Sequence, residues 1–167
     1  VLLSFDEDLG ALLQNEAVLH WELAKRGHRL GIDPELKFAH ANETSLLGIC
    51  RGYYLWHRCF GEIRARFAGM SAVQRTLRAI GSPALPLTRA VRIMRYLASE
   101  RPHEVLPFLR HLPVVLISQT FAALGTTAGL LFGKGGADAA FSIHDTDHPR
   151  PLPPGFNGRV AQAHHTG

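Results

Sequence analysis

NEAVLHWELAKRGHRLGIDPELKFAH, residues 15–40, is the stretch on which the interpretation of the whole chain depends. Its first half carries apolar residues at the three and four spacings of an amphipathic helix: Val18, Leu19, Trp21 and Leu23. Gly27 follows two basic residues and predicts the end of that helix. Glu16 lies in the first predicted turn, where unpaired backbone N–H groups favour a carboxylate.

The second half of this stretch predicts an extended segment. Alternate residues are apolar after the glycine, which places them on one face of a short strand, and Pro34 interrupts the pattern at a turn or an edge. The residues that share this face are Leu30, Ile32, Leu36, Phe38 and His40. The sequence therefore predicts a helix that leads into a strand ending in a histidine.

An ordered set of residues accompanies these two elements: Phe5, Asp6, Glu7, Asn15, Glu16, Gly27, Pro34 and His40. In this order they resemble the end of the catalytic domain in family-2 glycosyltransferases, the inverting GT-A enzymes that use nucleotide sugars. The resemblance covers roughly residues 4–60. Many members have Glu-Asp where this chain has Asn15-Glu16.

The resemblance implies roles for particular side chains. Glu16 would be the catalytic base, which removes the proton of the acceptor hydroxyl as its oxygen attacks the sugar. Asp6 and Glu7 would lie beside the acceptor site, Trp21 would contact substrate, and His40 would lie near the diphosphate or a metal ion. A divalent cation, Mg or Mn, would be held mainly by an upstream half of the enzyme.

Each of these side chains also has a purely structural explanation. Asp6 and Glu7 could belong to a solvated loop, and a first-turn carboxylate such as Glu16 is common for electrostatic reasons worth about 0.3–1 kcal/mol. Trp21 could be a core residue, and a single histidine at the end of a strand, such as His40, is often no ligand.

The 167 residues, 46% of them hydrophobic, could bury one ordinary core. The chain begins without methionine or a signal-like pattern, so we expect a C-terminal part of a longer enzyme, inactive alone. The expected fold is mainly α with one or two short strands. We expect the end of a GT-A domain over 1–42, basic amphipathic helices over 43–110, an apolar membrane or interfacial helix over 111–133 and a disordered tail over 134–167.

The middle of the chain is strongly basic. Between residues 43 and 110 there are 11 arginines and four glutamates, a net charge of +7. Such a segment suits anionic phosphate surfaces. Residues 46–67 predict one long helix with aromatic residues on one face, either a core helix or a helix on a membrane surface, which Asn42 could cap. Cys50 and Cys59 lie nine apart in it, so they cannot bridge and are expected to be reduced.

Two shorter helices are expected next. One ends at Gly81, and the other spans 89–100 with Thr88 as its cap. Residues 112–133 then carry no charge and are long enough to cross about 30 Å of hydrocarbon as a helix, although a buried hairpin or core helix fits the same pattern. Gly125, Gly129 and Gly133 repeat every four residues, which would let another helix approach closely.

The leading hypothesis is a glycosyltransferase at the cytoplasmic face of the cell membrane. A nucleotide-sugar would be the donor, and a lipid-linked or polysaccharide precursor of the cell envelope would be the acceptor. The alternative is a non-enzymatic helical module that docks on anionic membrane or on a partner protein. A nucleic-acid partner is not expected, because no reading motif is present. The sequence leaves association between copies of the chain open.

Overall fold

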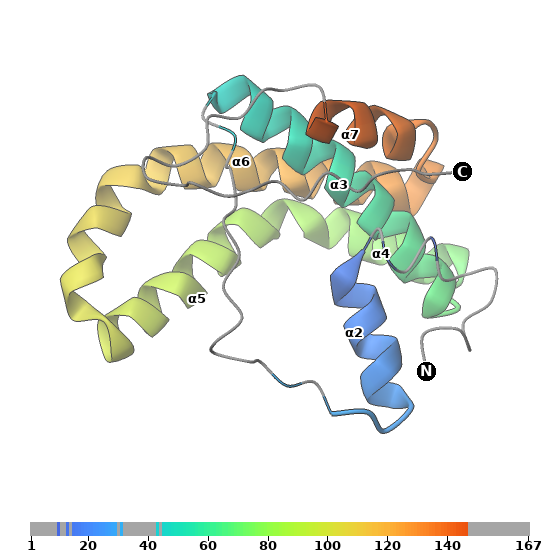
Figure 1. The fold of residues 1–167 in the computed structure, drawn as a ribbon, viewed down its shortest axis with the longest axis horizontal. Coiled ribbons are helices and arrows are strands. Elements are labelled where there is room, and N and C mark those ends of the chain that lie inside the picture. The colour runs from blue at the N-terminus through green and yellow to red at the C-terminus, as the bar shows by residue number, and fades with distance from the viewer. Residues whose placement is uncertain are drawn as a thin grey trace, which may run out of the picture.

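The computed structural model describes residues 10, 13, 15–29, 31, 43 and 45–146. The elements within them are helices, in the order α2 (Glu16–Lys25), α3 (Leu46–Phe67), α4 (Ala72–Gly81), α5 (Leu85–Glu100), α6 (Val105–Phe132) and α7 (Ala137–Thr146) (Figure 1). The turns Ser82–Ala84 and Pro102–Glu104 lead into α5 and α6. The prediction of a mainly α chain is confirmed for this part. The predicted strand segment, 30–40, lies outside the described residues except for Gly31.

The contact between α3 and α6 is the centre of the fold, with α7 alongside α3 (Figure 1). A Cβ on Gly61 of α3 would lie 2.6 Å from the carbonyl oxygen of Thr126, and a Cβ on Gly129 would overlap the carbonyl of Arg58. Gly125 faces the α3 backbone in the same way. The glycines of both helices thus let the two backbones touch, which confirms the predicted close helix approach at Gly125 and Gly129.

Side chains fix both ends of this helix pair. The Ser45 hydroxyl caps α3 by accepting a hydrogen bond from the backbone N–H of Gly48 at 3.0 Å. Asn42, the expected cap, lies outside the described residues. At the other end, Arg58 Nε donates to the carbonyl oxygen of Gly133 at 3.0 Å, where a cation also suits the negative end of the α6 dipole. Gly133 has a φ of 74°, a conformation that favours glycine.

Two helices begin earlier than the hydrophobic pattern predicted. α5 starts at Leu85 instead of residue 89, because Pro86 falls in the first turn, where its missing N–H removes no hydrogen bond. Thr88 is inside α5 and its hydroxyl donates to the carbonyl of Leu85 at 3.1 Å, so it is no cap. α6 starts at Val105 and runs through the expected boundary at residues 110 and 111, with Pro113 inside it.

The prediction of disorder from residue 134 onward is wrong for Ala137–Thr146. These residues form α7, and its buried residues Ala137 and His144 pack against α3, where His144 faces Gly52. Contact with α3 stabilises this ten-residue helix, which would be too short to be stable alone.

A small core joins α2 to the middle of α3. Its buried members are Val18, Leu19, Cys59, Phe60, Ile63 and Ala137. Cys50 and Cys59 are both buried and unbridged, as the sequence predicted. Burial raises the pKa of the Cys59 thiol, so the neutral form is favoured there.

Candidate functional site

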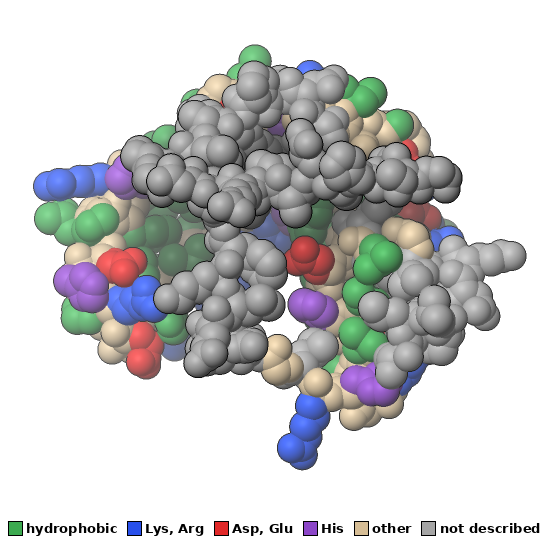
Figure 2. All heavy atoms as spheres, in the orientation of Figure 1, with side chains coloured by type: hydrophobic (Ala, Val, Ile, Leu, Met, Phe, Trp, Pro, Cys, Tyr) green, Lys and Arg blue, Asp and Glu red, His purple; other side chains and the backbone are tan. Residues whose placement is uncertain are grey.

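The predicted catalytic carboxylate stands at the first residue of α2. Glu16 is exposed, and His20, one turn further along the helix, is exposed as well. In the space-filling view, an acidic and a histidine side chain lie at the surface near α2 (Figure 2). An acceptor hydroxyl could therefore reach a carboxylate at this position from solvent, which is the minimum that a general base requires.

Asn15, immediately before α2, is fully buried. Its side chain makes no capping hydrogen bond to the helix, and within the described part of the chain neither Oδ1 nor Nδ2 has a hydrogen-bond partner. A buried amide without partners costs about 1–3 kcal/mol for each unmade bond, so such groups often receive a water or a ligand. Asn15 was part of the sequence pattern, but only its burial marks it as a candidate site residue.

The other predicted site residues are distributed unevenly. Asp6, Glu7 and His40 lie outside the described residues. Trp21 is 45% exposed, with its ring edge-on to Phe60 at 5.9 Å between centroids and the Arg64 guanidinium 5.3 Å above it. Trp21 is therefore neither a fully buried core residue nor an isolated platform, because an arginine already covers one face of its ring.

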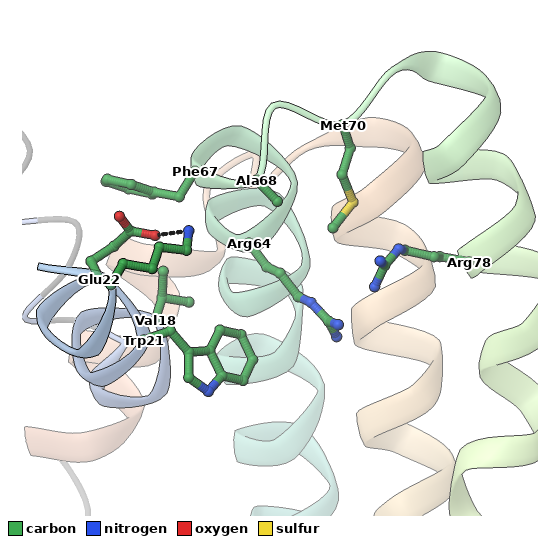
Figure 3. A pocket seen from close by; sticks show the side chains of 9 residues that line it. Val18, Trp21, Glu22, Arg64, Phe67, Ala68, Met70 and Arg78 are labelled. Atoms are coloured by element: carbon green, nitrogen blue, oxygen red, sulfur yellow. Dashed lines mark hydrogen bonds and ion pairs between the residues drawn. The ribbon is translucent and has the colours of Figure 1, made fainter. Parts of the chain in front are cut away.

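Arg64 is the centre of a groove between α2 and α3 on one side and α4 and α5 on the other. We use "the Arg64 groove" for three adjoining pockets of about 270, 370 and 310 Å³, all lined by Arg64. Trp21 and Phe67 close the first pocket, where Arg78 extends from α4 toward Arg64 (Figure 3). The second pocket adds four residues of α5, which are Leu85, Thr88, Arg89 and Arg92.

Positive side chains predominate among the charged residues that line this groove. Burial, and then the charge of Arg78, lower the pKa of Arg64. Burial and the neighbouring Arg92 lower the pKa of Arg89, whose guanidinium donates a hydrogen bond to Gln119 Oε1 at 2.6 Å. Arginine nevertheless stays protonated in proteins. The groove therefore holds several positive charges near low-dielectric walls, and within the described residues none of them forms an ion pair with a carboxylate. The sequence showed this arrangement only as an overall basic balance.

A second notable surface is formed by large apolar side chains that face outward. On α4, Val73, Leu77 and Ile80 are 64–71% exposed, while Ala79 is buried. On α6 the exposed large residues include Val114, Ile117, Phe121, Leu124 and Leu131 at helical spacings. The segment Pro102–Phe132 is long and apolar enough to cross a membrane, a property that the core helix of a soluble protein can share.

Metal-binding groups do not gather in this part of the protein. Within the described residues, no set of three or more His, Cys, Asp or Glu side chains could hold an ion. The expected Mg or Mn site therefore has no counterpart among these residues, and no chemical step is assigned to a metal here.

The comparisons with family models, with curated proteins and with solved structures give no match to this chain. The geometry of the described residues and the sequence pattern are thus the grounds for any functional assignment.

Proposed function

We propose that this chain is the C-terminal part of a membrane-associated inverting glycosyltransferase. It would take a sugar from a nucleotide-diphosphate sugar and transfer it to a lipid-linked or polysaccharide acceptor at the cytoplasmic face of the membrane. In this proposal α2 presents the catalytic base, and the later helices hold the protein on the anionic membrane surface.

The single observation that carries the membrane part is the inverted burial of α4 and α6. Large aliphatic and aromatic residues are usually the most buried in a soluble domain, and large exposed apolar patches mark contact surfaces. Here Leu77 and Ile80 are 64% and 71% exposed, while the neighbouring Ala79 is 4% exposed. α6 likewise buries Ser118 and Thr126, and it exposes Phe121 and Leu124 although it buries Leu130. Of the two, α4 is amphipathic, and a helix with its orientation suits the headgroup boundary of a bilayer.

Arginine side chains support an anionic surface as the partner. α4 and α5 carry Arg75, Arg78, Arg89, Arg92 and Arg95 and only one carboxylate, Glu100. This net positive charge attracts an anionic leaflet, and the cations nearest the surface contribute about 1 kcal/mol each. Apolar insertion and this charge together would give the two signals that stable membrane association needs.

The transferase part rests on the order of residues around α2 and on the exposure of Glu16. An exposed carboxylate at a helix start can accept the acceptor proton, and inverting transfer needs only one such base. The side-chain amide of Asn15, the preceding residue, is buried and makes no hydrogen bond within the described residues. His40, Asp6 and Glu7 remain candidate substrate residues, and a divalent ion would stabilise the leaving diphosphate from the upstream half.

Vesicle binding tests the membrane part. We expect the chain to sediment with vesicles that contain anionic lipid, and the pair Leu77→Ser and Ile80→Ser to lower that binding at least tenfold, since both side chains would leave the bilayer. The pair Leu77→Val and Ile80→Val, which keeps an apolar surface and the same charge, is the control. Equal binding of the serine and valine pairs would contradict the proposal.

Release of nucleoside diphosphate from a nucleotide-sugar tests the transferase part, in the protein that contains this chain. Glu16→Gln should slow turnover at least about a hundredfold, the usual contribution of a general base. Glu22→Gln is the matched control on the same helix, because Glu22 is paired with Lys25 at 2.5 Å. Near-normal turnover of Glu16→Gln would end the assignment of this base.

A second candidate function is a non-enzymatic helical module that docks on anionic membrane. The inverted burial of α4 and α6 favours it equally, because this surface needs nothing from Glu16. Vesicle binding that depends on Leu77 and Ile80, with no sugar transfer by any form of the protein, would favour the module over the enzyme.

A further inference from the structure

We infer that the Arg64 groove is a binding site for the phosphate or diphosphate group of a ligand that enters from the aqueous side. The inference goes beyond the proposed function, because it needs neither Glu16 nor a sugar donor. Four arginines line the groove: Arg64 from α3, Arg78 from α4, and Arg89 and Arg92 from α5.

The fold brings these arginines together although they are far apart in the chain. Arg64 lines all three pockets of the groove, Arg78 shares two of them with it, and Arg89 shares a third. The side chains of Arg64 and Arg78 extend toward one another from two different helices (Figure 3). Guanidinium groups that converge in this way repel each other, so the fold carries an energetic cost that a bound anion would offset.

Carboxylates in the described part of the protein do not neutralise these charges. The cations that pair with Asp or Glu in this part are Lys25, Arg101, His103 and Lys134, and none of the four arginines is among them. Among the described residues, Glu22 is the acidic residue that lines the groove, and Lys25 already pairs with it at 2.5 Å. The charge that converges on Arg64 is therefore available to an external anion.

The chemistry of the lining suits phosphate in particular. A guanidinium presents planar paired N–H donors that match two phosphate oxygens, and such charge-assisted bonds are stronger than neutral ones. The hydroxyls of Thr88 and Ser82 already donate to backbone carbonyls, so the arginines are the donors for an anion. Phe60, Leu85 and Leu130 supply apolar walls that strengthen the electrostatic attraction. Trp21 and Phe60 fix Arg64 from one side through cation–π contacts at 5.3 and 5.8 Å.

The position of the groove on its helices indicates which source of phosphate it would meet. Successive helical residues are about 100° apart, so on α4 Arg78 lies roughly 100–160° around the helix from the exposed Val73, Leu77 and Ile80. The apolar residues of α4 that would face a bilayer thus lie on the opposite side of that helix from Arg78. A phosphate ester in solution, or one extended from the surface, is the expected ligand.

Titration calorimetry with inorganic pyrophosphate tests the site. We expect saturable binding at 0.15 M salt, weakened at least about tenfold by Arg64→Gln, because a charged hydrogen-bond donor is lost. Arg95→Gln is the matched control: it removes the same charge from an exposed residue of α5 that does not line the groove, and it should change binding less than threefold. Far-UV circular dichroism checks that both variants are folded.

A second arm identifies the source of the phosphate. Vesicles that contain phosphatidic acid are compared with vesicles that contain phosphatidylserine at equal surface charge. Pyrophosphate binding that depends on Arg64 supports a soluble phosphate ester, and an Arg64-dependent preference for phosphatidic acid without pyrophosphate binding supports a lipid phosphate. Equal behaviour of Arg64→Gln and Arg95→Gln in both arms would overturn the site, whatever the result of the sugar-transfer assay.

Discussion

The two faces of α6 differ in the size of their side chains more than in their polarity. The inner face meets α3 through Gly125, Gly129 and Thr126, all buried, whereas the outer face exposes Phe121 and Leu124. A hydrophobicity profile treats these faces alike, because the helix is apolar all round. This difference shows that close backbone contact with α3 holds α6 in the fold. The large side chains of the outer face are not needed for that contact and could pack against another apolar surface.

Adding one methyl group to the inner face should have the largest effect. Gly129→Ala would place a Cβ in the space of the Arg58 carbonyl, and we expect a loss of about 3 kcal/mol or more in the free energy of unfolding. Gly81→Ala, at the end of α4 where a Cβ meets nothing within 4 Å, should change it by less than about 1 kcal/mol. Urea unfolding measures both, and equal stabilities would show that α3 and α6 are not in backbone contact.

The same leucine substitution on either face sharpens the comparison. Leu130 is 4% exposed and Leu124 is 53% exposed, on the same helix. Leu130→Ala should cost about 2–4 kcal/mol through the lost burial and the cavity, and Leu124→Ala less than about 1 kcal/mol. Only Leu124→Ala should weaken vesicle binding without loss of fold. A larger stability loss for Leu124→Ala would mean that the outer face is packed in solution.

Acid should weaken the contact between α3 and α6 through His57. This residue of α3 faces Thr126 of α6, and His57 Nδ1 lies 3.3 Å from the Thr126 hydroxyl oxygen. Burial, and then the charge of Arg89, lower the pKa of His57 to about 4. Between pH 6.5 and 4, His57 is therefore protonated in the unfolded chain and neutral in the folded chain. The free energy of unfolding is unaffected by His57 protonation above pH 6.5, and it falls by up to about 3 kcal/mol as the pH drops to 4.

Unfolding free energies measured at several pH values check this prediction. His57→Gln should flatten the slope between pH 4 and 6.5, whereas His103→Gln, at an exposed position, should leave it unchanged. The same slope in His57→Gln and the unchanged protein would contradict the role of His57.

The smallest effect is expected just beyond the end of α6. Lys134 Nζ donates to Asp138 Oδ2 at 2.7 Å, and this bond lowers the pKa of Asp138. The stabilisation from this ion pair is present above the usual carboxyl pKa, and it is lost as the pH falls and Asp138 becomes protonated. Asp138→Asn should cost less than about 1 kcal/mol at pH 7, because the pair is solvent-screened. The cost should shrink further in 0.5 M salt, and a loss independent of salt would point to packing instead.

Part of the candidate site could be foreseen from the sequence and part could not. The order of residues around Glu16 gave a hypothesis about its role, and the basic balance gave anionic partners, because both depend on residue types alone. The convergence of Arg64, Arg78 and Arg89 could not be foreseen, because it depends on how three helices cross. The buried amide of Asn15 was equally invisible, since nothing in a sequence shows what surrounds a polar side chain.

The sequence by itself determined that the described chain is helical, where α3 and α4 lie, and that glycines of α6 would meet another helix. Helical periodicity and residue size are local properties, so they can be read without coordinates. Tertiary structure alone decided that the glycines meet α3, that Ala137–Thr146 is ordered, and that apolar residues of α4 and α6 face outward. Periodicity gives a helix its faces, but only contact with the other helices decides which face is buried.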